Sequence, residues 1–137
     1  MADSLDAVWV PNRNGVFINI GAAFAESYHC EYVVTGFNRE EAGEFPDNSA
    51  EYVSRASDAL ALSTRDGVTV ASFTLDLSKV EIIRLGVDLR APLSIVWSCH
   101  LGGEHMCGRC LSCRKLAAAL AKLPEEARPR IPIEFQV

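Results

Sequence analysis

The chain has 137 residues, a length that suits one domain. Apolar residues make up 49% of it, enough for a hydrophobic core, and the net charge of −5 argues against the basic face that nucleic-acid binding requires. No apolar run approaches the length of a membrane span, and Asp3 and Asp6 stand where a signal peptide needs positive charge. We therefore expect a cytoplasmic protein that binds neither a membrane nor nucleic acid directly.

Extended and helical segments alternate along the chain. We expect a short extended stretch at 7–10, a buried apolar helix at 16–28 and a buried strand at 32–37. A polar loop then leads to a helix at 49–62 and, beyond the Asp66-Gly67 turn, to a strand at 68–74. Helices at 79–89 and 111–123 follow, with Pro124 ending the second. The alternation predicts an α/β fold with parallel strands.

Several polar residues have the spacing of helix caps. Asn48 and Glu51 form one possible capping box, and Ser78 and Glu81 form another. Asn14 precedes the first helix, so its simplest interpretation is an N-cap. Cys30 stands apart from the other cysteines, and we expect it to be a small buried apolar side chain.

Four of the five cysteines crowd into residues 99–113, with the spacing C-x7-C-x2-C-x2-C: Cys99, Cys107, Cys110 and Cys113. Four thiolates in a tetrahedral array suit Zn²⁺, and such a full shell leaves no open position for catalysis. The spacing therefore predicts structural zinc. An iron–sulfur cluster is an alternative, disfavoured because no Cys-Pro follows Cys113. As a further alternative, His100 or His105 replaces one cysteine as a ligand.

Other polar residues gather in the loops that follow the predicted strands. Arg13 and Asn14 lie in the first of these loops, and Asn38 and Asp47 lie in the second. Ligands of parallel α/β sheets bind beyond the carboxyl ends of the strands, so both loops are candidate binding sites. Lys79 begins a predicted helix, where a cation opposes the helix dipole, and this hints at an anion nearby. Taken singly, each of these residues also fits a cap or a solvated surface.

Four segments together resemble one family: VPNRN before an apolar helix, VVTGFNREEAGEFPDN, LSKVEIIRLG and WSCHLGGEHMCGRCLSCR. From Val8 to about Leu120, the chain resembles the C-terminal half of 7-cyano-7-deazaguanine synthases. The resemblance implies one domain over 1–137. Within it, residues 1–96 would form a partial Rossmann-like parallel sheet of the adenine nucleotide alpha-hydrolase type, 97–123 a zinc subdomain with the C-terminal helix, and 124–137 a tail.

The reaction that the resemblance implies converts 7-carboxy-7-deazaguanine and ammonia to the nitrile, for queuosine modification of tRNA. ATP, expected with Mg²⁺, activates the carboxylate and then the amide. Arg13, Asn14 and Lys79 are expected to bind the nucleotide and its pyrophosphate, and Lys79 matches the family's Ser-Lys-x-Glu motif. Asn38 and Asp47 are expected to bind the deazaguanine edge. No role is assigned to the three glutamates in the same loop, Glu40, Glu41 and Glu44.

One feature of the family has no counterpart in the sequence. The family begins with a strand and a Ser-Gly-Gly-x-Asp-Ser pyrophosphate (PP) loop, and neither occurs here. A parallel sheet without its opening strands should expose an edge and an apolar face, so we expect a homo-oligomer or a PP-loop-bearing partner chain.

Three explanations for the missing loop stay open: half of a split enzyme, a shortened gene product, or a chain that has lost catalysis and kept a binding role. The alternative function is accordingly a non-catalytic, zinc-stapled binding module. A zinc-ribbon nucleic-acid binder is disfavoured by the acidic balance of the chain.

Overall fold

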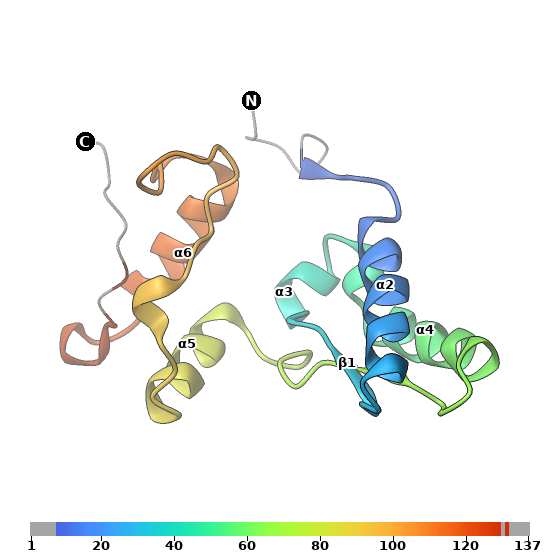
Figure 1. Ribbon diagram of the computed structural model, residues 1–137. Coiled ribbons are helices and arrows are strands. Elements are labelled where there is room, and N and C mark those ends of the chain that lie inside the picture. Colours follow the sequence, from blue (N-terminus) through green and yellow to red (C-terminus); the bar gives the residue numbers. More distant parts are fainter. Residues whose placement is uncertain (1–7, 130, 132–137) are drawn as a thin grey trace. The chain divides into compact units, whose positions relative to one another are not determined.

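The computed structural model describes residues 8–129 and 131 (Figure 1). The chain divides into two compact units: one spans Val10–Ser78, and the other consists of the described residues of Met1–Trp9 and Lys79–Val137. Each unit has a hydrophobic core of its own. Within the described ranges, no helix is long and apolar enough to cross a membrane.

A two-stranded parallel sheet lies in the Val10–Ser78 unit. β1 (Tyr32–Val34) and β2 (Thr69–Ala71) pair with Val33 opposite Val70. The crossover between them contains α3 (Arg39–Ala42), the 3-10 turn η1 (Pro46–Asn48) and α4 (Ala50–Ser63). Parallel strands need a crossover of this kind, and the observed pairing confirms the predicted α/β class. Both strands are shorter than predicted, and the loop at 38–48 contains two short helical turns that were not predicted.

The helices α2 (Arg13–Ser27) and α4 pack on one face of this sheet. Their shared core consists of Ile18, Ala22, Ala25, Phe37, Leu60, Val68 and Val70, with Val33 packed against it. Because side chains alternate along a strand, Val33 and Val70 face this core while Tyr32 and Val34 face away from it. Gly21 allows α2 to lie close to β1, since a Cβ at this position would be 3.1 Å from Cγ1 of Val33.

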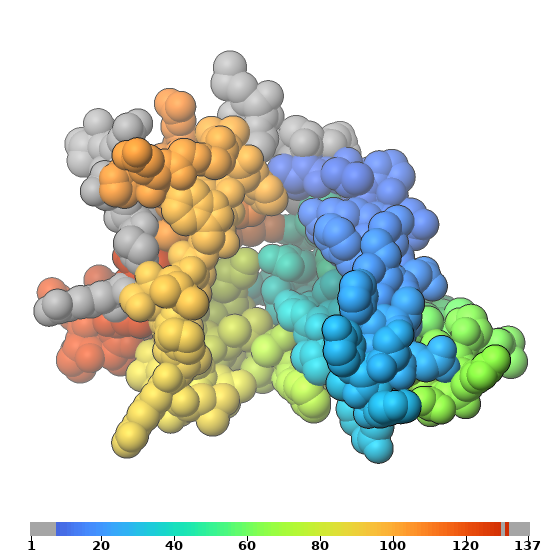
Figure 2. Space-filling model, in the orientation of Figure 1, coloured from blue at the N-terminus to red at the C-terminus, as the bar shows by residue number. Residues whose placement is uncertain are grey.

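The outer side of α2 is apolar and exposed, so the prediction of a helix buried nearly all round was wrong. Phe17, Ile20 and Phe24 are 63%, 52% and 60% exposed. Figure 2 shows the atoms of α2 (blue) at the surface. The prediction of a buried first strand was also wrong, since Tyr32 and Val34 are 54% and 62% exposed. Both segments are apolar, but no other described element of this unit covers these side chains.

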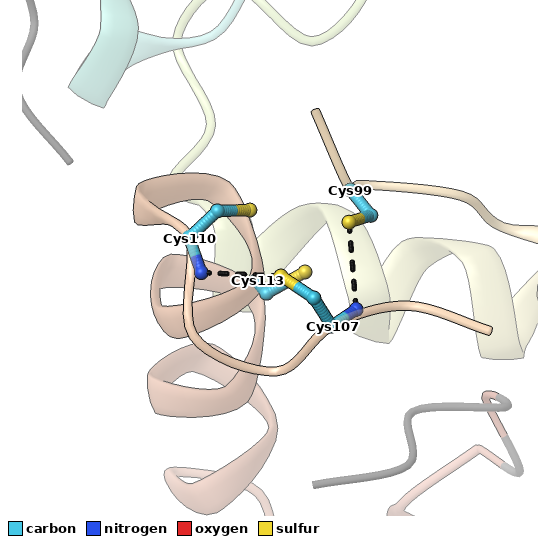
Figure 3. Close-up of side chains that lie close together, drawn as sticks. All are labelled: Cys99, Cys107, Cys110 and Cys113. Carbon is cyan, nitrogen blue, oxygen red and sulfur yellow. Dashed lines mark hydrogen bonds between the residues drawn. The ribbon is translucent and has the colours of Figure 1, made fainter. Parts of the chain in front are cut away.

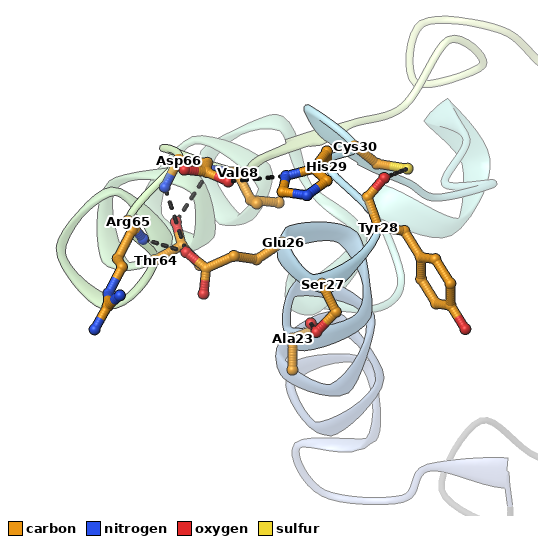
Figure 4. A network of polar contacts seen from close by, with 10 residues as sticks. All are labelled: Ala23, Glu26, Ser27, Tyr28, His29, Cys30, Thr64, Arg65, Asp66 and Val68. Carbon is orange, nitrogen blue, oxygen red and sulfur yellow. Dashed lines mark hydrogen bonds and ion pairs between the residues drawn. The ribbon is translucent and has the colours of Figure 1, made fainter.

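Polar contacts fix the end of α2 to the turn before β2 (Figure 4). The Glu26 carboxylate accepts hydrogen bonds from the backbone N–H groups of Arg65 and Asp66. His29 has a left-handed φ of 56°, which turns the chain out of the helix. Cys30 follows at the surface and is exposed, so its predicted burial was wrong: the chain passes from α2 to β1 along the outside of the unit.

Two helix starts differ from the predicted ones. Ser49, not Asn48, caps α4, and its Oγ accepts a hydrogen bond from the Tyr52 N–H at 3.1 Å. At α2 the N-cap position belongs to Asn12, which has a left-handed φ of 57° and makes no side-chain cap bond. Asn14 therefore lies inside the helix, and Asn48 lies in η1. Both side chains are buried, which makes them available for contacts other than capping.

The second unit packs α5 (Lys79–Asp88) against α6 (Leu111–Ala121). Its core consists of Ile83, Cys99, Met106, Cys110, Cys113, Leu116, Ala119 and Leu123. The 3-10 turn η2 (Leu93–Ile95) precedes the cysteine loop, and the 3-10 turn η3 (Glu125–Ala127) follows α6. Arg128 caps the end of α6, because its guanidinium donates to the carbonyls of Leu123 and Ala121 at 3.0 and 3.2 Å.

Both helices of this unit begin at their predicted residues and end slightly earlier than predicted. The predicted extended stretch at 7–10 forms no strand in Val8–Val10, and Ala7 lies outside the described residues. Residues 130 and 132–137 of the predicted tail also lie outside them.

Candidate metal centre and polar loops

Three short segments of the second unit bring four cysteine sulfurs together (Figure 3). Cys99 follows η2, Cys107 and Cys110 lie on either side of a tight turn, and Cys113 lies in the first turn of α6. Gly108 provides the left-handed φ of 66° that this turn requires. The four sulfurs lie within 4.8 Å of one another. Sulfurs bound tetrahedrally at about 2.3 Å to one zinc ion are about 3.8 Å apart, so only small shifts would let the four share an ion.

Backbone hydrogen bonds favour thiolates in this cluster. The N–H of Cys107 donates to Sγ of Cys99 at 3.4 Å, and the N–H of Cys110 donates to Sγ of Cys107 at 3.3 Å. Hydrogen bonds from the backbone of Cys110 and Arg109 lower the pKa of Cys107 to about 6. Burial has the opposite effect on Cys113, whose pKa rises to about 12 because a lone thiolate there would lose its hydration. A bound cation would reverse that effect by supplying the opposite charge.

The two histidines near the cysteines are not part of this cluster. Among the described residues, the group close enough to hold a metal ion consists of the four cysteines alone. Nε2 of His100 lies 2.6 Å from Oγ of Ser112, and His100 is exposed. The four cysteines are therefore the candidate ligand set, and the set could hold one metal ion.

A polar cluster in the first unit contains two of the other predicted site residues. Asn14 is buried, and its Nδ2 donates to Oδ1 of Asn48 at 3.2 Å and approaches the carbonyl oxygen of Asp47 at 3.4 Å. Oδ1 of Asp47 is buried and has no hydrogen-bond partner among the described residues. Burial, together with the nearby Asp47 charge, raises the pKa of Tyr52. A buried acceptor of this kind calls for a donor, and a ligand or a water could provide one.

Two residues of this cluster, Asn48 and Tyr52, were not among the predicted site residues. The spacing of Asn48 predicts a helix cap and gives no sign of its contact with Asn14, and the only sequence signal of Tyr52 is its place on a predicted helix. Two other predicted site residues, Asn38 and Arg13, lie at the starts of α3 and α2. Asn38 is 4% exposed, and its side chain accepts a hydrogen bond from the Glu41 N–H at 3.0 Å, so it caps α3. Arg13 is exposed at the start of α2.

Lys79 begins α5 and belongs to the second unit, whereas the other polar site residues belong to the first. Hydrogen bonds join the loops that leave the two strands of the first unit. The carbonyl oxygen of Phe37 accepts from the hydroxyls of Ser72 and Thr74 at 3.1 and 2.7 Å. The carboxyl ends of both strands thus meet at one end of the sheet, which is where such folds bind ligands.

The sequence profile of one family, described as "Queuosine biosynthesis protein QueC", matches residues 1–124. The chain belongs to the QueC family. Similar proteins include the 7-cyano-7-deazaguanine synthases of Pelotomaculum thermopropionicum and Carboxydothermus hydrogenoformans, which are 58% and 57% identical to this chain over 112 and 116 residues. The corresponding protein of Methanobrevibacter smithii is 38% identical over 125 residues.

These alignments cover 82%, 85% and 90% of the chain but only 51%, 54% and 55% of the three relatives. The chain thus spans about half the length of the curated QueC relatives that it matches. The family match confirms the resemblance found in the sequence and connects the chain to queuosine biosynthesis.

Proposed function

We propose that this chain contributes half of a 7-cyano-7-deazaguanine synthase, an ATP-dependent ligase that makes the nitrile from 7-carboxy-7-deazaguanine and ammonia. Its membership of the QueC family carries the proposal. In this proposal β1 and β2 are two strands of a larger Rossmann-like sheet of the adenine nucleotide alpha-hydrolase type. The four cysteines bind structural zinc, which holds the cysteine loop to α6.

The polar cluster around Asp47 supports a role in substrate binding. A deazaguanine presents N–H donors along one edge, and the buried Oδ1 of Asp47 is an acceptor without a partner in the described structure. Asn14 lies beside it and is held by Asn48. The side-chain oxygen of Asn38 caps α3, so the side-chain NH2 group is the part of Asn38 that would contact the substrate.

The proposed reaction needs cations where pyrophosphate leaves. A carboxylate oxygen of the substrate attacks the α-phosphorus of ATP and expels pyrophosphate, and ammonia then displaces AMP to give the amide. A second ATP activates the amide oxygen in the same way, and loss of AMP and a proton leaves the nitrile. Arg13 and Lys79 are the candidates to bind pyrophosphate, with Asn14 at the nucleotide and Mg²⁺ on the phosphates.

The exposed apolar surface supports the need for a second polypeptide. Phe17, Ile20 and Phe24 form a stripe on α2 with spacings of three and four residues, and Tyr32 and Val34 are exposed on the face of β1 that points away from the core. Within the described residues, β1 pairs with β2 alone, so its second edge is open. Exposed apolar side chains, together with an open strand edge, are characteristic of surfaces that pack against another part of a protein.

The direction of the sheet favours one kind of partner. A strand that continues this parallel sheet next to β1 must run parallel to it, whereas two copies related by a two-fold axis would pair their β1 strands antiparallel. We therefore favour a PP-loop-bearing partner over a homodimer formed through this edge. The whole assembly would act in the cytoplasm on a free base, so it would not need to bind tRNA.

Reconstitution tests the proposed function. The zinc-loaded chain is mixed with the half of the Pelotomaculum thermopropionicum synthase that has no counterpart in it, and formation of the nitrile and of AMP is followed by mass spectrometry. We expect product only when both polypeptides, ATP and ammonia are present. Calorimetry measures binding of 7-carboxy-7-deazaguanine to the chain alone. Substrate binding without turnover in any mixture would instead support the non-catalytic binding module.

A further inference from the structure

The sulfurs of the cysteine cluster receive hydrogen bonds from the backbone and from one neighbouring side chain. Backbone N–H groups donate to Cys99 and Cys107. Sγ of Cys113 lies 3.7 Å from the hydroxyl oxygen of Ser98, the residue that immediately precedes Cys99. Unlike the backbone donors, this hydroxyl can be removed by a substitution.

Ser98 has two sulfur neighbours and two donor groups. Its backbone N–H lies 3.2 Å from Sδ of Met106, and its Oγ lies 3.4 Å from the same sulfur. A thioether is a weak acceptor, and the N–H group already satisfies it. A metal-bound thiolate carries negative charge and is a much stronger acceptor, so the hydroxyl proton is directed to Cys113 when an ion is bound.

The surroundings of Ser98 hold it in this position. Met106 is 1% exposed, so the thioether that Ser98 touches is fixed in the core of the unit. Nε1 of the preceding Trp97 donates to the carbonyl oxygen of Cys99 at 3.0 Å, which ties the same segment to the cluster. The Ser98–Cys113 contact therefore links the start of the cysteine loop to α6.

We propose that Ser98 is a positioning residue of the metal centre, whose hydroxyl donates to the Cys113 thiolate and orients that ligand. Groups that hydrogen-bond to metal ligands set the orientation of those ligands, and their removal typically weakens metal binding about 10- to 100-fold. The inference rests on the metal site of the proposed function and is independent of the reaction that is assigned there.

The test compares Ser98→Ala and Ser98→Thr with Ser112→Ala as a matched control. Ser112 also has a hydroxyl beside the cluster, but that hydroxyl pairs with His100. Zinc affinity is measured by competition with a chelator, and the sulfur-to-metal charge-transfer band is measured after loading with Co²⁺. We expect Ser98→Ala to weaken zinc binding about tenfold and to shift the band. Ser98→Thr should restore both properties, and Ser112→Ala should change neither.

Two results would overturn the role of Ser98 while leaving the metal site intact. In the first, Ser98→Ala matches the unsubstituted chain in zinc affinity and in the cobalt band. In the second, zinc affinity falls but Ser98→Thr does not restore it, which assigns the effect to packing. If the unsubstituted chain itself gives no four-thiolate cobalt spectrum, the metal site fails, and the role of Ser98 fails with it.

Discussion

The side-chain amide of Asn14 donates to Oδ1 of Asn48 at 3.2 Å, across 34 positions of sequence. Both residues are buried, at 8% and 7% exposure. This contact joins the first turn of α2 to the turn before α4, and it lies beside the unpartnered carboxylate oxygen of Asp47. One buried amide pair thus connects the stability of the first unit to the geometry of its candidate substrate site.

Breaking this pair should destabilise the first unit. Asn48→Ala leaves the Asn14 amide buried without its side-chain acceptor, which should lower the free energy of unfolding by about 1–3 kcal/mol. Urea unfolding followed by circular dichroism measures the change. Asn19→Ala is the matched control, because the Asn19 side chain bonds within α2 to the carbonyl of Gly15. If both variants lose the same free energy of unfolding, the Asn14–Asn48 pair contributes no more than an ordinary hydrogen bond within a helix.

Asp47→Asn should weaken binding of 7-carboxy-7-deazaguanine about 10- to 100-fold, because a hydrogen bond to a charged acceptor contributes about 1.5–3 kcal/mol. The amide keeps the shape of the side chain, so the melting temperature should change little. Calorimetry on the reconstituted complex measures the affinity. Asp58→Asn, an exposed carboxylate on α4, serves as the control. Unchanged affinity in Asp47→Asn would remove this residue from the substrate site.

Cys110→Ser should abolish tight zinc binding and lower the melting temperature of the second unit, because structural zinc contributes folding free energy. Elemental analysis after dialysis gives the metal content, and thermal unfolding gives the stability. Cys30→Ser is the matched control, since Cys30 is exposed and lies outside the cluster. If Cys110→Ser keeps its zinc and its melting temperature, the assignment of the four ligands is wrong.

The lowered pKa of Cys107 predicts a pH dependence in the chelator-treated chain. The folded state lowers this pKa from 9.0 to about 6, so the thiolate stabilises the fold fully above pH 9 and loses this effect as the pH falls toward 6. Cys107→Ser should therefore have a smaller rise in stability between pH 6 and pH 9. Urea midpoints across this range, with chelator present, measure both slopes. Parallel slopes would contradict the lowered pKa.

The exposed stripe on α2 should be needed for assembly and not for folding of the chain. The double variant Phe17→Ser, Phe24→Ser changes side chains that are 63% and 60% exposed, so the free energy of unfolding should change by about 0.5 kcal/mol or less at each position. Its binding to the complementary synthase half, measured by calorimetry, should be lost. Leu62→Ser, which changes a 92% exposed apolar residue on α4, should bind normally. Normal binding by the double variant would place the interface elsewhere.

Local sequence patterns were sufficient for the features that depend on near neighbours in the chain. The C-x2-C-x2-C spacing identified the cysteine cluster because a short turn alone can aim successive sulfurs at one point. Apolar periodicity located α5 and α6, whose starts at Lys79 and Leu111 match the predictions. The motifs of the four segments identified the family, since their order is a property of the sequence and not of its folding.

Tertiary structure decided which of these segments are covered and which distant residues meet. The apolar composition of α2 predicted burial, but burial also needs a covering element, and none of the described elements of the first unit lies over Phe17 or Phe24. Asn48 had the spacing of a cap, yet Ser49 caps α4, and the side chain of Asn48 instead accepts a hydrogen bond from Asn14. Sequence alone determined the family, the candidate metal ligands and the α/β alternation. Only packing decided the buried amide pair and the exposed apolar stripe, because contacts between remote segments depend on how the helices pack on the sheet.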